Sequence, residues 1–169
     1  ILIGGKGNDT FMSRGGVNTI YGGTIDNSLV SGEINTISYE DETRNIIVDM
    51  SQNKSGINDS GIISNTDNAT LHGVQNAIGG SGDDILNGES GNDYVDYSEL
   101  TNEIGIIEGV KVDLTITSQQ DTKKTGLDTL SEIENVIGTS YNDTIIGTTE
   151  DNIILAGAGN DTIVSNGST

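Results

Sequence analysis

Gly4-Gly5-Lys6-Gly7-Asn8-Asp9-Thr10-Phe11-Met12 is a nine-residue unit of the form Gly-Gly-x-Gly-x-Asp-x-apolar-x, and the chain repeats it. The pattern returns in residues 79–87 and, with no gap, in residues 88–96. Glycine suits backbone positions with positive φ, and a short apolar strand can follow the aspartate. A repeat of this length predicts a stack of similar units, each made of a tight turn and a short strand.

The eighth place of each unit is apolar. Counting in nines from Gly4 and again from Gly138, this place holds Phe11, Ile20, Leu29, Ile145, Ile154 and Ile163. We expect these side chains to point inward, one for each unit. Because no stretch shows the 3.6-residue apolar spacing of a helix, we predict an all-β fold of stacked coils, a β-solenoid.

A longer period is also present, since residues 69–79 align without gaps to residues 128–138, a shift of 59 residues. We therefore expect one elongated domain over residues 1–169. Its repeat blocks are 1–38, 70–96 and 129–169, and β-strand insertion segments lie at 39–69 and 97–128. The polar stretches 51–68 and 116–126 are expected to be surface loops.

The composition argues for bound cations. Only 32% of the 169 residues are hydrophobic, too few for an ordinary globular core, and 26 acidic against 7 basic residues give a net charge of -19. Carboxylates at this density repel one another unless cations neutralise them. The lack of clustered Lys and Arg argues against nucleic acid and anionic membranes as partners, and the lack of an 18-residue apolar run argues against membrane insertion.

The two ends of the sequence lead us to expect an internal fragment of a larger protein. The chain opens on Ile1-Leu2-Ile3 directly before a glycine pair and stops within a unit. The absence of cysteine excludes disulfides and thiolate metal sites and is compatible with a secreted protein stabilised by metal.

Calcium fits the repeated turn chemically, because it takes about six to eight oxygens from carboxylates, carbonyls and water. If consecutive turns lie on opposite sides of a flattened coil, turns 18 residues apart stack about 4.7–4.9 Å apart. Asp143 and Asp161 have this spacing and form the best-defined pair. The plain alternative is that these residues only form turns.

Catalysis is the less favoured interpretation of the acidic residues. A pair such as Asp83 and Asp84 could act as acid and base only in a cleft with perturbed pKa values, which nothing in the sequence suggests. His72 is the one histidine, too few for a zinc site or a Ser/His/Asp set. We therefore predict that the chain is not an enzyme.

Units 4–12, 79–96 and 138–164 resemble the RTX, or hemolysin-type calcium-binding, repeats of secreted bacterial toxins, proteases and giant adhesins. The resemblance implies a right-handed parallel β-roll that binds several Ca²⁺ ions. The ligands would be the sixth-place aspartate and backbone carbonyls of the first four places in stacked turns. One implied ion set is Gly138, Ser140, Asp143, Gly157, Gly159 and Asp161, and a second is Gly4, Lys6 and Asp9 facing Gly23, Ile25 and Asn27.

The remaining implied ligands lie in the middle and later turns. They are Gly80, Gly82 and Asp84, then Gly91 and Asp93 stacked on Gln75, and Glu134 stacked on Asn152. For Asp84 the sequence offers no partner 18 residues later.

The resemblance also implies a function: a calcium-binding structural module of a secreted bacterial surface or extracellular protein, such as an adhesin, S-layer or matrix protein. Such a chain would leave the cell unfolded by type I secretion and fold on Ca²⁺ outside. Expected partners are calcium and either neighbouring repeats of the parent chain or a second copy, end to end. The alternative is the non-catalytic C-terminal region of an exported enzyme or toxin, and carbohydrate binding through tyrosines is a third possibility.

Overall fold

The computed structural model describes residues 1–13, 16–23, 35–39, 41, 44–50, 52–59, 62–72, 74–80, 82–88, 92–98, 108–123 and 125–167. Within these ranges every regular element is a β-strand, so the prediction of an all-β fold is confirmed. The strands are β1 (Leu2–Ile3), β2 (Thr10–Met12), β3 (Val17–Tyr21), β4 (Thr36–Ser38), β5 (Ile46–Asp49), β6 (Lys54–Asp59), β7 (Ile62–His72), β8 (Asn76–Ile78), β9 (Ile85–Asn87), β10 (Tyr94–Asp96), β11 (Lys111–Asp113), β12 (Gln120–Asp121), β13 (Leu127–Ser131), β14 (Asn135–Ile137), β15 (Thr144–Ile146), β16 (Ile154–Leu155) and β17 (Thr162–Val164).

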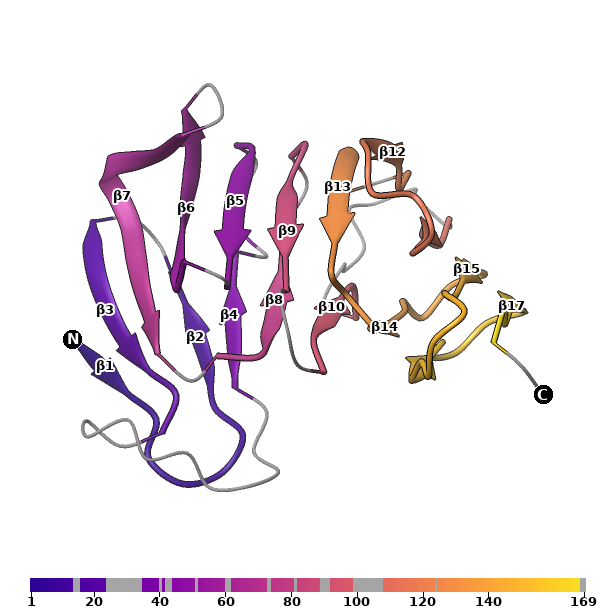
Figure 1. Cartoon of the computed structure of the whole chain (residues 1–169), viewed down its shortest axis with the longest axis horizontal. Helices are drawn as coiled ribbons and strands as arrows, with labels where there is room; N and C mark the ends of the chain where they lie inside the picture. The colour runs from indigo at the N-terminus through magenta and orange to yellow at the C-terminus, as the bar shows by residue number, and fades with distance from the viewer. Residues whose placement is uncertain are drawn as a thin grey trace.

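The strands form a stack of coils along the long axis of the molecule, with the two termini at opposite ends (Figure 1). One sheet has the order β16-β14-β10-β8-β4-β2 and is parallel throughout. A second has the order β1-β3-β7-β6-β5-β9-β13-β12, and a third has the order β11-β15-β17. A chain that winds through two faces of a coil returns to each face in the same direction, which gives these parallel pairs.

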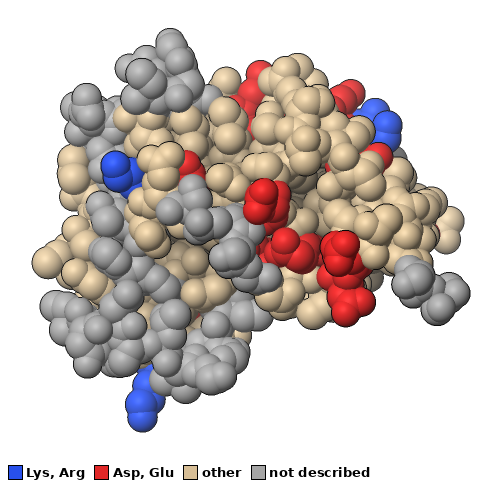
Figure 2. Space-filling view, viewed as in Figure 1, with Lys and Arg blue, Asp and Glu red and all other residues tan. Residues whose placement is uncertain are grey.

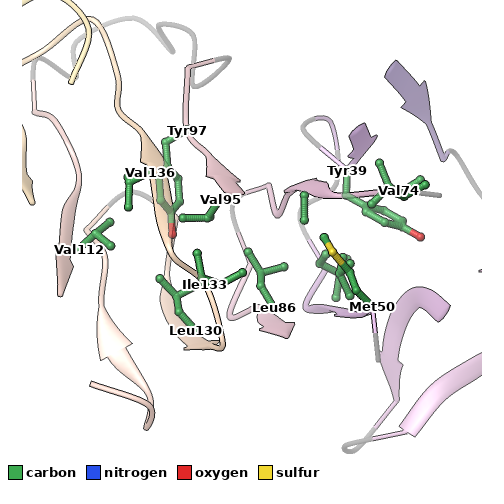
Figure 3. Packing of buried hydrophobic residues seen from close by; sticks show 14 of the residues in the cluster. Tyr39, Met50, Val74, Leu86, Val95, Tyr97, Val112, Leu130, Ile133 and Val136 are labelled. Atoms are coloured by element: carbon green, nitrogen blue, oxygen red, sulfur yellow. The ribbon is translucent and has the colours of Figure 1, made fainter. Parts of the chain in front are cut away.

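Apolar residues that face inward from successive strands make the core. Across the parallel sheet, Phe11 lies opposite Ile37, Ile37 opposite Ala77, and Val95 opposite both Ala77 and Val136. All five are buried, and they belong to one cluster that runs through the stack (Figure 3). Each coil therefore buries few apolar groups alone, and its neighbours complete the burial.

Tyr39 and Tyr97 directly follow β4 and β10, and their side chains are only 4% and 2% exposed. In Figure 3 the Tyr97 ring lies beside Val95 and Val136. The Tyr39 hydroxyl and the buried Ser55 hydroxyl share a hydrogen bond of 2.7 Å. The Tyr97 hydroxyl is buried without a hydrogen-bond partner among the described residues.

The expectation of surface loops is wrong for most of 51–68, which forms strands, whereas in 116–126 only the two residues of β12 form a strand and most of the described residues are exposed. β6 pairs antiparallel with β5 and β7, and β7 pairs in parallel with β3, so the hairpin is inserted into one sheet between β3 and β5. β12 pairs antiparallel with β13. These strands join their neighbours through backbone hydrogen bonds, which need no apolar alternation in the sequence.

No helix in the described part of the chain is long and apolar enough to cross a membrane. On the face shown in Figure 2, acidic side chains gather over the middle of the molecule, whereas basic ones lie near its margins.

Candidate metal centre

Strand register stacks the sixth-place residues of neighbouring coils. Because Thr144 pairs with Thr162, Asp143 and Asp161 lie next to each other, as their spacing of 18 residues predicts. The backbone N–H of Asp143 donates to Asp161 Oδ1 at 2.9 Å. Equivalent bonds at 2.9–3.0 Å run from Asp9 N to Asn35 Oδ1, from Asn35 N to Gln75 Oε1, from Asp84 N to Asp128 Oδ1, and from Asp93 N to Glu134 Oε2. The sixth-place oxygens thus connect one coil to the next.

Two kinds of glycine shape the turns. Gly5 and Gly7 have φ values of +99° and +106°, a region that residues with a side chain adopt at a cost. The first-place glycine serves a different purpose. A Cβ on Gly4 would collide with the Asp9 carboxylate, and one on Gly138 would lie 2.5 Å from Asp143 Oδ2. The carboxylate therefore folds back over the first glycine and closes the turn.

The turn 4–9 fits a calcium ion. Asp9 Oδ2 is buried and has no hydrogen-bond partner among the described residues. An unsatisfied buried carboxylate oxygen is costly unless a cation or donor meets it. Backbone carbonyls of the same turn would have to supply the neutral oxygens that calcium also takes.

At this turn the described residue beside Asp9 is not the one that the spacing led us to expect. We expected Asp9 to face Asn27, 18 residues later, but β2 pairs with β4 and brings Asn35 to Asp9 at 3.0 Å. The register between β1 and β3 does follow the 18-residue spacing, and Gly5 N donates to Gly23 O at 3.2 Å. The strand opposite β2 is displaced along the sequence, which the nine-residue count did not show. Asn27, Ile25 and Gly91 lie outside the described residues.

Asp143 has a different environment from Asp9. Its Oδ2 accepts from Thr139 N at 2.8 Å, and its Oδ1 accepts from Thr139 Oγ1 at 2.7 Å and from Val110 N at 2.8 Å. The side chain is 2% exposed. Three donors already satisfy this carboxylate. The Ser140 side chain is exposed, as is the turn at Gly157 and Gly159, whose φ values are +90° and +132°.

Asp84 lies between two insertion segments. Its Oδ1 accepts from Ile46 N at 2.9 Å, and its own N–H donates to Asp128 Oδ1 at 3.0 Å. Gly80 has a φ of +105°, and Gly82 packs directly against the Arg44 backbone. Asp84 and Asp128 are each 1% exposed.

Asp128 was missed by the sequence reasoning. It is 44 residues from Asp84, far from the expected spacing, but the run Asp128-Thr129-Leu130 has the form of Asp143-Thr144-Ile145 and could have revealed it. Burial raises the pKa of Asp128 to about 6, against smaller effects of hydrogen bonds from Thr122, Asp84 and Thr125. Burial, followed by the charges of Asp128 and Asp84, raises the pKa of Tyr97 well above its usual value.

The turns around Asp93 and Asn152 stack as predicted. Tyr94 N donates to Gln75 O at 3.3 Å, so Asp93 lies beside Gln75 in the preceding coil. Asn152 Nδ2 donates to Glu134 O at 2.8 Å. Stacking alone leaves the metal-binding role of these residues a prediction.

Backbone oxygens would have to complete any ion site among the described residues. No three His, Cys, Asp or Glu side chains there come together closely enough to hold a metal. An ion at turn 4–9 would therefore combine one carboxylate with carbonyls, including that of Lys6, whose side chain is exposed.

Comparison with known families agrees with this geometry, while comparison with curated proteins gave no match. The model of the RTX calcium-binding nonapeptide repeat matches in four copies over residues 1–29, 73–99 and 137–168, together more than half of the chain. The matched segments contain nonapeptide turns described above, and the strands β2, β10 and β15 that follow such turns pair in parallel with their neighbours. The chain therefore belongs to the family of RTX calcium-binding nonapeptide repeat proteins.

Proposed function

We propose that this chain is a structural module of a secreted bacterial surface or extracellular protein and that calcium binding outside the cell folds it. The observation that carries the proposal is the buried Asp9 Oδ2, which lacks a hydrogen-bond partner in a turn of positive-φ glycines. The family's repeats bind calcium, and this turn offers the oxygen that a cation would satisfy.

Charge explains why the ion would matter for folding. The net charge of -19 opposes compaction, and the sixth-place carboxylates are brought into neighbouring coils. A bound calcium ion supplies positive charge and a link between chain segments. Asp9 would hold the ion through its buried oxygen, while Gly4 leaves the space in which the carboxylate folds back.

The expected energetic effect is large relative to the stability of a small domain. A ligand that binds only the folded state contributes about 2.7 kcal/mol for each site at one hundred times its Kd. Several sites could therefore decide between an unfolded chain in the low-calcium cytoplasm and a folded one outside, which suits export by type I secretion. Low hydrophobicity and high charge favour disorder when calcium is removed.

A calcium titration tests the proposal. Far-UV circular dichroism should show a change from coil to β-structure with calcium but not with magnesium at the same concentration. Asp9→Asn removes one ionic ligand and should raise the calcium midpoint, whereas Asp121→Asn, which changes an exposed carboxylate, should not. A chain that is fully folded in chelator would refute the calcium-driven folding.

The ends of the stack support a role within a longer assembly. Leu2 and Ile3 on β1 are 41% and 50% exposed, and Ile163 and Val164 on β17 are 49% and 42% exposed. Further repeats of a parent chain would cover these apolar edges. The same edges could instead be covered by a second copy of the chain. Size-exclusion chromatography during the calcium titration tests this, since large calcium-dependent species would indicate copies stacked end to end.

The alternative remains the non-catalytic C-terminal region of an exported enzyme or toxin, because the repeat is a structural calcium-binding unit in itself. The parent sequence distinguishes the two, as a catalytic domain upstream would favour the alternative and continued repeats would favour the structural module.

A further inference from the structure

The described nonapeptide turns differ in their second place. Turns 4–9 and 156–161 have glycine there, with φ values of +99° at Gly5 and +90° at Gly157. Turns 138–143 and 147–152 have threonine instead, at Thr139 and Thr148, and neither threonine has a positive φ. The two kinds of turn therefore follow different backbone paths.

In turn 138–143, Thr139 donates a hydrogen bond to each carboxylate oxygen of Asp143. Thr139 N donates to Asp143 Oδ2 at 2.8 Å, and Thr139 Oγ1 donates to Asp143 Oδ1 at 2.7 Å. Tyr141 N then donates to Thr139 Oγ1 at 3.0 Å. Thr139 thus links the second, fourth and sixth places of the turn by hydrogen bonds.

Turn 147–152 makes the same arrangement without a carboxylate. Thr148 N donates to Asn152 Oδ1 at 2.8 Å, and Glu150 N donates to Thr148 Oγ1 at 3.2 Å. The amide also donates from Nδ2 to Glu134 O at 2.8 Å. Because Asn152 carries no charge, this turn closes through hydrogen bonds alone.

Turn 4–9 lacks this closure. Gly5 has no hydroxyl, and its backbone N–H donates to Gly23 O at 3.2 Å instead of closing the turn as Thr139 N does. The buried Asp9 Oδ2 has no hydrogen-bond partner among the described residues. The oxygen that threonine satisfies in the other turns is left there for a cation. The second place therefore distinguishes turn 4–9, which has an unsatisfied carboxylate oxygen, from the two turns that threonine closes.

We infer that Thr139 and Thr148 replace the calcium ion in their turns, so that turns 138–143 and 147–152 hold no ion of their own. The inference rests on the proposed function, and it limits the calcium dependence to turns with glycine in the second place. If so, the Asp143–Asp161 pair is not the strongest calcium site, although the two residues are in register. Threonine turns would give this part of the module a closure that calcium removal does not break.

The number of ions that the folded state holds can be measured from stability. At calcium concentrations above the Kd of the folded state's sites, the free energy of unfolding from urea titrations rises with the logarithm of calcium concentration, with a slope set by the number of ions released on unfolding. Asp143→Asn should leave this slope at the wild-type value, since Asn152 shows that an amide can close such a turn. Asp9→Asn, the same chemical change in a two-glycine turn, should lower the slope by up to one ion.

The reverse change provides a gain of binding. Replacing Thr139 and Tyr141 by glycine converts turn 138–143 to Gly-Gly-Ser-Gly-Asn-Asp, the form of turn 4–9. This double variant should bind one additional calcium ion by isothermal titration calorimetry. Thr139→Val, which loses only the hydroxyl bonds, should lower the urea midpoint equally at every calcium concentration without changing the slope.

The outcomes separate the two proposals. If the free energy of unfolding of the wild-type chain does not change with calcium concentration, the proposed function itself is refuted. A positive wild-type slope that Asp143→Asn lowers as much as Asp9→Asn would overturn only the present inference. If Asp143→Asn does not fold at any calcium concentration, the glycine double variant decides, because the absence of an added ion would also overturn it.

Discussion

Replacing Asp128 with asparagine should stabilise the folded chain at neutral pH. The carboxylate is 1% exposed, and burial raises its pKa from the usual 3.8 to about 6. The folded state therefore holds the proton more tightly than the unfolded state. The stabilising contribution of the protonated form is fully present below pH 3.8 and is lost as pH rises through about 6.

The shift sets the magnitude. A difference of about two pKa units, at about 1.4 kcal/mol for each unit, makes the ionised carboxylate cost about 3 kcal/mol at pH 7.5. Asparagine cannot ionise, and its Oδ1 can still accept the hydrogen bond from Asp84 N. The variant should therefore be more stable by up to about 3 kcal/mol at pH 7.5, and by roughly half of that at pH 5.

Urea unfolding followed by circular dichroism measures the difference at saturating calcium between pH 5 and 7.5. Asp121→Asn is the matched control, because it removes the same formal charge from an exposed carboxylate in the neighbouring strand β12. The control should change stability little at any pH. An Asp128→Asn variant that is less stable than wild type at pH 7.5 would refute the reasoning, since the ionised carboxylate would then be stabilised, as by a bound cation.

The tyrosines and the eighth-place isoleucines give two further comparisons by urea unfolding. Tyr97→Phe should be neutral or slightly stabilising because the lost hydroxyl has no hydrogen-bond partner among the described residues, whereas Tyr39→Phe should cost about 1–3 kcal/mol by leaving the buried Ser55 hydroxyl unsatisfied. Equal losses of stability for Tyr97→Phe and Tyr39→Phe would contradict this difference. Ile145→Ala should cost about 2–5 kcal/mol because its side chain is fully buried, and Ile163→Ala, in the matching place but 49% exposed, should cost clearly less. Similar costs at both places would show that burial of the side chain does not set its contribution to stability.

Much of the fold was predictable because the period of nine residues fixes both the turn and the inward place. Ile20, Val95 and Ile145 are fully buried at eighth places, as the count predicts. The hairpin of β6 and β7 was not predictable in this way. Its strands are held by backbone pairing to each other and to β3 and β5, and main-chain hydrogen bonds leave little mark on side-chain composition.

The candidate site was predictable only where repeats follow one another directly. Asp143 and Asp161 stand 18 residues apart and do stack, but the hydrogen bonds that satisfy Asp143 come from Thr139 and from Val110, an insertion residue. Whether a carboxylate is left for an ion depends on these donors. That information lies in the second place of the turn and in the neighbouring coil.

The sequence by itself determined the all-β stack, the acidic charge and the family of the repeat, because these follow from composition and from a period that local turns enforce. Only the tertiary structure decided which carboxylates stack where insertions interrupt the repeat, such as Asp9 on Asn35 and Asp84 on Asp128. The physical reason is that lengthening a loop costs little free energy, so an insertion can change the sequence distance between stacked turns without disturbing the stack. Register is then set by strand pairing and apolar burial, and these depend on the assembled coils.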